Sequence, residues 1–167
     1  MNTARFLLLL TGICFAAIST PSAASEKPRV AVLGFELINT SLEPTSADEI
    51  RRLEMLGDEF RKMLDASGRF VTVDIPPDVQ EAIARGPAIH GCNGCERDFA
   101  ARAGADLAAW GTVRKVSNLI LSINVYLIDA RTGERVFARS VDIRGNTDES
   151  WRHGLRYLVR NYLLAEP

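Results

Sequence analysis

The order of apolar and polar positions predicts a strand, a long loop and a helix in the first third of the chain. Residues 29–35 (Arg-Val-Ala-Val-Leu-Gly-Phe) are almost all apolar, which is typical of a strand covered on both faces. Residues 36–45 are polar and irregular, and this predicts a loop. From 46 to 68 apolar residues recur at helical spacing. Ser46 with Glu49 three positions later predicts a capping box at the start of this helix.

The middle of the chain predicts one strand and two helices. Residues 70–75 are rich in β-branched side chains and indicate a strand, which two prolines end. A short helix is expected over 78–84. Asn93 has the side chain of an N-cap, and Gly104 is placed to end the helix that would follow.

Three further strands and a last helix are expected in the second half, over 107–117, 119–129, 134–144 and from about 146 to 162. The short connections between the three strands require antiparallel neighbours. The last helix is predicted to bury Trp151, Leu155, Leu158, Val159 and Tyr162. The predicted class is therefore α/β (α+β): one mixed sheet with helices packed on it, in the order β-α-β-α-α-β-β-β-α, ending in an antiparallel meander and a helix.

The first 24 residues have the composition of a secretory signal. Arg5 is their only charge, a mostly apolar run follows it, and a proline and three small residues end the segment. We expect a cleaved signal peptide over 1–24 and a single periplasmic α/β domain over 25–167. A retained anchor is disfavoured because the run is shorter than the roughly 20 residues that span a bilayer. Lipid attachment at Cys14 is disfavoured because Ile13 precedes it where a small residue is expected.

The charge balance excludes some classes of partner. The chain has 20 basic and 21 acidic residues and a formal charge of −1, so electrostatics gives no argument for nucleic acid or an anionic membrane. No apolar run after the leader is long enough to cross a membrane. The chain has neither a phosphate-binding glycine loop nor a nucleophile elbow, so we expect no cofactor and no catalytic residues.

Cys92 and Cys95 are the only cysteines after the leader, and they are the one pair that could perform chemistry. An oxidising compartment favours a structural disulfide between them. A thiol–disulfide redox protein is the first alternative, because Cys95 would lie in the first turn of a helix, where a thiolate is stabilised. Metal handling by His90, Cys92 and Cys95 is the second, with His153 as the only other histidine. We expect no metal.

The last helix and the turn before it carry the candidate contacts with a partner. Three arginines spaced four residues apart form a stripe beside the apolar face of the helix. A solvated flank explains this stripe, with Asp148 paired to Arg152, and the alternative is a contact surface for an acidic partner. The turn before this helix is expected to place Arg144, Asn146 and Asp148 together at a sheet edge. The candidate contact residues are Arg144, Asn146, Asp148, Arg152, Arg156 and Arg160.

Three segments of the chain resemble a known family. They are His90–Cys95 (HGCNGC), Lys115–Leu121 (KVSNLIL) and Asp142–Trp151 (DIRGNTDESW). They are similar to a family of small exported bacterial proteins described only as a domain of unknown function, of the DUF3280/DUF2380 type. The resemblance spans nearly the whole of residues 25–167. It implies a bacterial periplasmic protein and supplies no activity.

A looser resemblance connects the chain with the amino-terminal domain of TolB-type envelope proteins. It rests on the order of elements, on Val30–Phe35 (VAVLGF), and on Gly104–Asp106 (GAD) followed by Trp110–Val113 (WGTV). It implies an interaction module without an active site. Our leading hypothesis is therefore a non-enzymatic accessory module of the bacterial envelope that binds an unidentified periplasmic or envelope protein.

Overall fold

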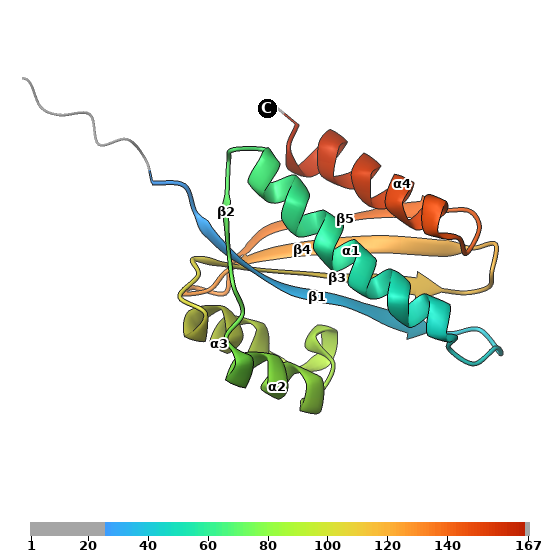
Figure 1. The fold of residues 1–167 in the computed structure, drawn as a ribbon, viewed down its shortest axis with the longest axis horizontal. Helices are drawn as coiled ribbons and strands as arrows, with labels where there is room; N and C mark the ends of the chain where they lie inside the picture. The colour runs from blue at the N-terminus through green and yellow to red at the C-terminus, as the bar shows by residue number, and fades with distance from the viewer. Residues whose placement is uncertain (1–25, 166–167) are drawn as a thin grey trace, which may run out of the picture.

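The structure is a computed structural model that describes residues 26–165, so the predicted signal peptide over 1–24 lies outside the described residues. Figure 1 shows the fold. The strands are β1 (Arg29–Asn39), β2 (Val71–Val73), β3 (Leu107–Lys115), β4 (Leu121–Asp129) and β5 (Arg135–Ile143). The α-helices are α1 (Ala47–Ala66), α2 (Pro77–Arg85), α3 (Cys95–Arg102) and α4 (Asp148–Leu158). A 3-10 turn, η1 (Ile89–Gly91), precedes α3, and a π-helical turn, η2 (Val159–Leu163), follows α4.

The five strands form one mixed sheet in the order β2-β1-β3-β4-β5. β1 lies parallel to β2 and to β3, because α1 and the α2–α3 segment return the chain to the same end of the sheet. β3, β4 and β5 are antiparallel neighbours. The predicted fold class and element order are therefore confirmed.

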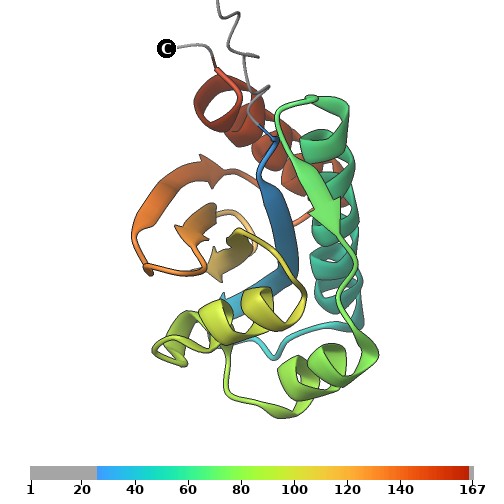
Figure 2. The same cartoon turned by 90° about the vertical axis from the view of Figure 1, so that its left-hand side faces the viewer.

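The helices cover the two faces of the sheet in pairs, as Figure 2 shows. On one face α1 and α4 pack Leu56, Phe60 and Trp151 against inward residues of the strands. On the other face α2 and α3 contribute Val79 and Phe99 to a smaller core. β1 and β3 are covered on both faces, whereas β5 lies at the edge of the sheet.

β1 extends four residues beyond its predicted end, so the expected loop over 36–45 is shorter than we predicted. Glu36 to Asn39 continue the parallel ladder with the last residues of β3, and Thr40 N–H donates to the Lys115 carbonyl at 2.9 Å. The polar side chains of this extension have partners on the molecule, and Leu37 packs against the core. Polar composition indicated a loop, but backbone pairing with β3 stabilises a strand.

Two glycines allow close packing that a side chain would prevent. A Cβ atom at Gly111 would lie 2.1 Å from the Phe35 ring, which covers that position of β3. A Cβ atom at Gly154 would lie 2.3 Å from Ile143 Cγ2. Gly154 therefore lets α4 approach the end of β5.

The end of the last helix differs from the prediction. Trp151, Leu155, Leu158 and Val159 are buried as expected, but Tyr162 is 45% exposed. The turn η2 is π-helical and has more residues per turn than an α-helix, so Leu163 takes the buried position that helical spacing gave to Tyr162. Within residues 26–165, none of the helices is sufficiently long and apolar to span a bilayer.

Candidate functional site

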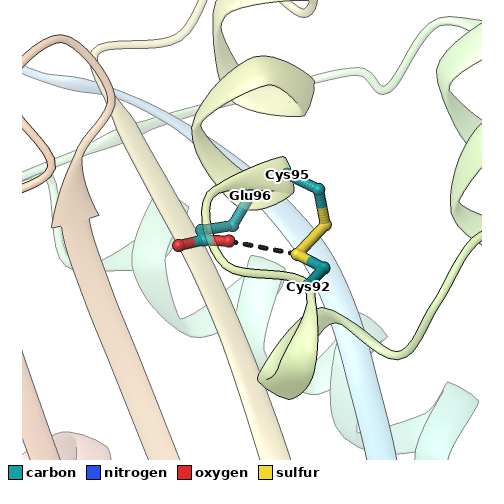
Figure 3. Close-up of side chains that lie close together, drawn as sticks. All are labelled: Cys92, Cys95 and Glu96. Atoms are coloured by element: carbon teal, nitrogen blue, oxygen red, sulfur yellow. Dashed lines mark hydrogen bonds between the residues drawn. A yellow bond between two sulfur atoms is a disulfide. The ribbon is translucent and has the colours of Figure 1, made fainter.

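The two cysteines lie in a tight loop between η1 and α3 (Figure 3). Their sulfur atoms are bonded, and their Cα atoms are 5.6 Å apart. Asn93 and Gly94 between them both have positive φ, at 53° and 117°. An N-cap side chain needs extended backbone, so Asn93 does not cap the helix as we predicted; Gly94 precedes the first helical residue, Cys95.

The Glu96 carboxylate lies against this disulfide. Its Oε2 atom accepts a hydrogen bond from Gly94 N–H at 3.1 Å and is 3.2 Å from Cys92 Sγ. A bonded sulfur carries no proton, so the second distance is a contact. In the reduced protein a carboxylate this close would oppose formation of a Cys92 thiolate, because two negative charges repel. The surroundings of Cys92 thus do not favour thiol–disulfide exchange.

His90 is held by a residue of β1 and not by the cysteines. Its Nδ1 atom is 2.7 Å from Glu36 Oε2, and its backbone N–H donates to the same carboxylate at 3.1 Å. Among residues 26–165, the potential metal ligands whose ligand atoms lie within 4.8 Å of one another are Cys92, Cys95 and Glu96. Metal ions bind thiolates, which a bonded pair does not present. The predicted alternative ligand set is therefore not brought together, since His90 is directed to Glu36.

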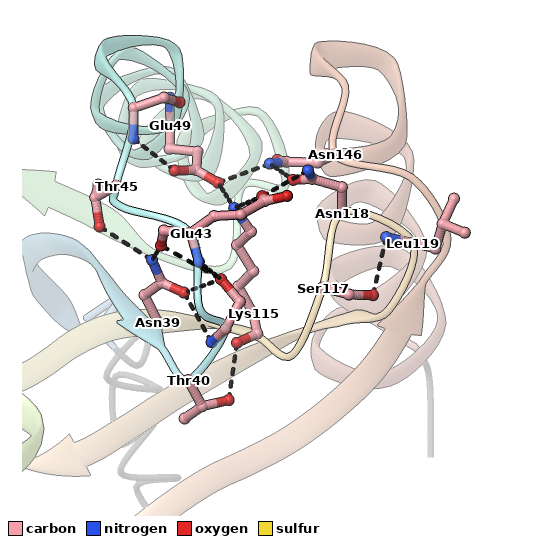
Figure 4. Close-up of polar contacts among 12 residues, drawn as sticks. Asn39, Thr40, Glu43, Thr45, Glu49, Lys115, Ser117, Asn118, Leu119 and Asn146 are labelled. Carbon is pink, nitrogen blue, oxygen red and sulfur yellow. Dashed lines mark hydrogen bonds and ion pairs between the residues drawn. The ribbon is translucent and has the colours of Figure 1, made fainter.

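A second polar group lies at the carboxyl end of β3 (Figure 4), and of its residues the sequence had indicated only Asn146 as a contact residue and Glu49 as a capping residue. We name Glu43, Glu49, Lys115, Asn118 and Asn146 the sheet-end cluster. Lys115 Nζ is 2.8 Å from Glu49 Oε1 and 3.2 Å from Glu43 Oε2. The Lys115 and Glu49 side chains are only 2% and 1% exposed. The pair is thus a buried salt bridge.

Hydrogen bonds satisfy the remaining atoms of the sheet-end cluster. Glu49 Oε2 accepts from Ser46 N–H at 2.7 Å, which completes the predicted capping box. Asn146 Nδ2 donates to Glu49 Oε1 at 2.7 Å and to Asn118 Oδ1 at 3.0 Å. Because these residues come from α1, the β3–β4 turn and the turn before α4, the cluster joins three separate parts of the chain.

Both members of the buried pair are charged near neutral pH. Burial raises the pKa of Glu49, but hydrogen bonds from Lys115, the Ser46 backbone and Asn146 outweigh it and lower the pKa to about 2. The hydrogen bond to Glu49 raises the pKa of Lys115 despite its burial. A general acid or base works best with a pKa near the operating pH. These groups are therefore suited to holding the fold together and poorly suited to proton transfer.

The turn before α4 is occupied by internal contacts. The Asp148 carboxylate accepts hydrogen bonds from Arg51 Nη1 at 2.8 Å and from Arg52 Nε at 2.7 Å, and both arginines belong to α1. These hydrogen bonds lower the pKa of Asp148, and the one from Arg51 has the larger effect. The predicted pairing of Asp148 with Arg152 is wrong, because two arginines of α1 reach Asp148. No local pattern indicated this, since 97 residues separate Arg51 from Asp148.

The four candidate arginines are all exposed, and they differ in their ion-pair partners. Arg156 Nε donates to Glu59 Oε1 of α1 at 2.6 Å. Arg152 and Arg160 are exposed, and within residues 26–165 neither has an ion-pair partner within 4.0 Å. Arg144 is exposed at the end of β5, where its carbonyl accepts from Ser150 Oγ at 2.8 Å. Of the six candidate contact residues, Arg144, Arg152 and Arg160 are therefore the exposed charges that have no ion-pair partner among residues 26–165.

The sequence and the fold place the chain in a class of protein. The chain belongs to the DUF3280 family, described as a protein of unknown function (DUF2380), whose model matches residues 28–163. This confirms the family resemblance inferred from the three segments. A comparison with curated proteins gave no match.

Three solved structures illustrate what the fold is similar to. The C-terminal domain of LpoB from Salmonella enterica is 14% identical with a TM-score of 0.53; the match covers 74% of this chain and 87% of that one. Lipoprotein GNA1162 from Neisseria meningitidis is 16% identical with a TM-score of 0.53, over 81% and 96% of the two chains. TolB from Acinetobacter baumannii is 13% identical with a TM-score of 0.46, over 83% of this chain and 28% of that one. At these identities the likeness to LpoB and GNA1162 shows a shared fold alone.

Proposed function

We propose that this protein is a non-enzymatic accessory module of the bacterial envelope. It would lie in the periplasm and bind another envelope protein. The leader over 1–24 would be removed, and the Cys92–Cys95 disulfide would fix the loop before α3. The family match and a fold shared with a lipoprotein support this setting.

One observation carries the proposal: exposed aromatic and basic side chains gather along α4, the turn η2 and the end of β5. Tyr157 and Tyr162 are 47% and 45% exposed, although their rings contact each other with centroids 5.9 Å apart. Arg144 is exposed and lines the same hollow as the two tyrosines, and Arg160 is exposed between them in the chain. Aromatic residues and arginine are enriched at protein interfaces. The groups elsewhere that could perform chemistry are paired internally. Cys92 is bonded to Cys95, and Lys115 forms a salt bridge with Glu49.

The test is crosslinking in living cells at native abundance. A photoreactive amino acid replaces Tyr157 or Arg160 in the chromosomally encoded chain, and adducts from envelope extracts are identified by mass spectrometry. The matched control carries the same amino acid at Glu81, which is exposed on α2 on the opposite face of the sheet. We expect one envelope polypeptide to be recovered from positions 157 and 160 and not from position 81. Recovery of no polypeptide from either position 157 or position 160 would contradict the proposal.

A further inference from the structure

β5 presents a free edge whose pairing with β4 is regular from Phe137 to Ile143 and shifts register between Phe137 and Arg135. Within the part of the chain that the structure describes, β5 pairs with β4 alone, while β2 forms the other edge with only three residues. In an antiparallel pair, alternate residues of an edge strand direct their N–H and C=O groups outward. A row of backbone donors and acceptors therefore lines this side of the sheet beside α4 (Figure 1).

A groove follows this edge. Two hollows of about 540 and 440 Å³ lie along β5, and both are lined by Tyr162. The first lies between residues 140–144 and the His153, Gly154 and Tyr157 side of α4. The second continues along residues 135–139. We name them together the β5 groove. Because it runs parallel to a strand of nine residues, its shape suits an extended peptide.

The charge of the β5 groove selects the kind of peptide. Three arginines line it, against a single carboxylate, that of Asp142. The three arginines are Arg135, Arg139 and Arg144. The chain as a whole has one more acidic than basic residue, so this local excess of positive charge does not follow from composition. Acidic side chains flanking an added strand would complement it.

The same charges argue against a second copy of this chain as the occupant. Pairing β5 with β5 of another copy would place two basic edges side by side, and like charges on neighbouring strands are destabilising. Positive charge on an edge strand also discourages self-association. Val136 on β5 is 55% exposed and, with the two tyrosines, offers the apolar contact that an added strand needs.

We propose that an extended acidic segment of another polypeptide pairs with β5 as a sixth strand and occupies the β5 groove. This inference rests on the proposed function, because it names the surface and the chemistry of the partner. Backbone hydrogen bonds to β5 would supply affinity, and the three arginines would supply preference for acidic side chains.

A defined peptide tests the inference. The probe is a fluorescein-labelled ten-residue peptide that alternates Glu and Val, titrated into the purified full-length protein while anisotropy is recorded. We expect saturable binding of this peptide, and binding about tenfold weaker or weaker for the peptide that alternates Lys and Val. Two further peptides carry N-methyl groups on all glutamates or on all valines. Because alternate residues face β5, we expect one of these two to lose binding.

Matched variants of the protein locate the peptide. The double variant Arg135→Glu, Arg139→Glu is expected to weaken binding of the Glu-Val peptide about tenfold and to strengthen that of the Lys-Val peptide. The control, Arg114→Glu, reverses an exposed charge of β3 outside the groove and should leave the binding of both peptides unchanged. Circular dichroism of each variant verifies that it is folded.

The outcomes separate this inference from the proposed function. Equal binding of both N-methylated peptides, or a loss of binding in Arg114→Glu equal to that in the double variant, would overturn strand addition at β5. Sedimentation that shows a dimer abolished by the double variant would replace the acidic segment by a second copy. If crosslinking recovers a partner from position 160 while the peptide does not bind, the accessory function stands and the β5 site falls. If the peptide binds and crosslinking recovers nothing, the reverse holds.

Discussion

The sheet-end cluster and the β5 groove both contain charged residues, but the structure uses them in opposite ways. In the sheet-end cluster each charged side chain has an internal partner, and Lys115 lies between two carboxylates. The β5 groove is lined by three exposed arginines and by one carboxylate, that of Asp142. The difference arises from position in the sheet: β3 is covered on both faces, whereas β5 is an edge. Charges in covered regions stabilise the fold, and charges at the edge remain available to a partner.

The largest effect is expected from breaking the buried pair. Lys115→Met leaves the Glu49 carboxylate buried without its counter-charge, so we expect the free energy of unfolding to fall by about 3–5 kcal/mol. Denaturant unfolding followed by circular dichroism measures this. The control is Arg114→Met on the same strand, where the side chain is exposed and the change should stay within about 0.5 kcal/mol.

A double variant sharpens this result. Lys115→Met combined with Glu49→Leu removes both charges, and part of the lost stability should return because no unpaired charge remains buried. If Lys115→Met alone unfolds at the same denaturant concentration as the unmodified protein, the cluster would have to be regarded as solvated, like the groove.

Acid should weaken the sheet-end cluster through Glu49. The pKa of Glu49 is about 2 in the folded protein against an ordinary value of 4.5, a difference equivalent to about 3 kcal/mol. Because the unfolded chain takes up this proton at the higher pH, the contribution is complete above pH 4.5 and is lost as the pH falls toward 2. Unfolding curves between pH 7 and 2 measure it.

The matched pair of variants for this prediction is Glu49→Gln and Glu54→Gln. The stability advantage of the unmodified protein over Glu49→Gln should shrink on acidification, whereas Glu54, which is exposed on α1, should show no such convergence. Parallel pH profiles for the unmodified protein and Glu49→Gln would show that Glu49 does not supply this acid sensitivity.

Removal of the disulfide should have an intermediate effect. The closed loop is short, so replacing both cysteines by serine is expected to lower the free energy of unfolding by about 2 kcal/mol. The double variant should retain the crosslinked partner and the peptide binding, since the loop lies on the α3 side of the sheet. A reduction potential above about −300 mV, measured against glutathione, would contradict a purely structural bond.

The smallest effect is expected for the salt bridge that links α4 to α1. Arg156 and Glu59 are 47% and 20% exposed, so solvent screens their attraction. Arg156→Ala should lower the free energy of unfolding by about 1 kcal/mol or less. If Arg156→Ala lowered the free energy of unfolding as much as Lys115→Met, the sheet-end cluster would not differ in stability from the exposed salt bridge of α4. Thermal unfolding of the two variants, side by side, decides this.

Local patterns predicted most of the helices and strands, because each of these elements depends on the spacing of apolar and polar residues close together in the chain. The capping box at Ser46 and the alternation in β4 are examples, and both are present in the structure. The prediction was wrong where the helix changed from α-helical to π-helical spacing, and where a residue adopted a positive φ. The π-helical turn η2 exposed Tyr162, and the positive φ of Asn93 moved the start of α3 to Cys95.

The sequence by itself determined the class of fold, the order of its elements and the one pair of neighbouring cysteines, because these depend on the spacing of residues close together in the chain. Only the tertiary structure decided which charges are buried and which are free. Lys115 meets Glu49, and Arg51 meets Asp148, across 66 and 97 residues of chain. Such contacts depend on how the sheet and helices pack, and local hydrophobic periodicity does not encode them.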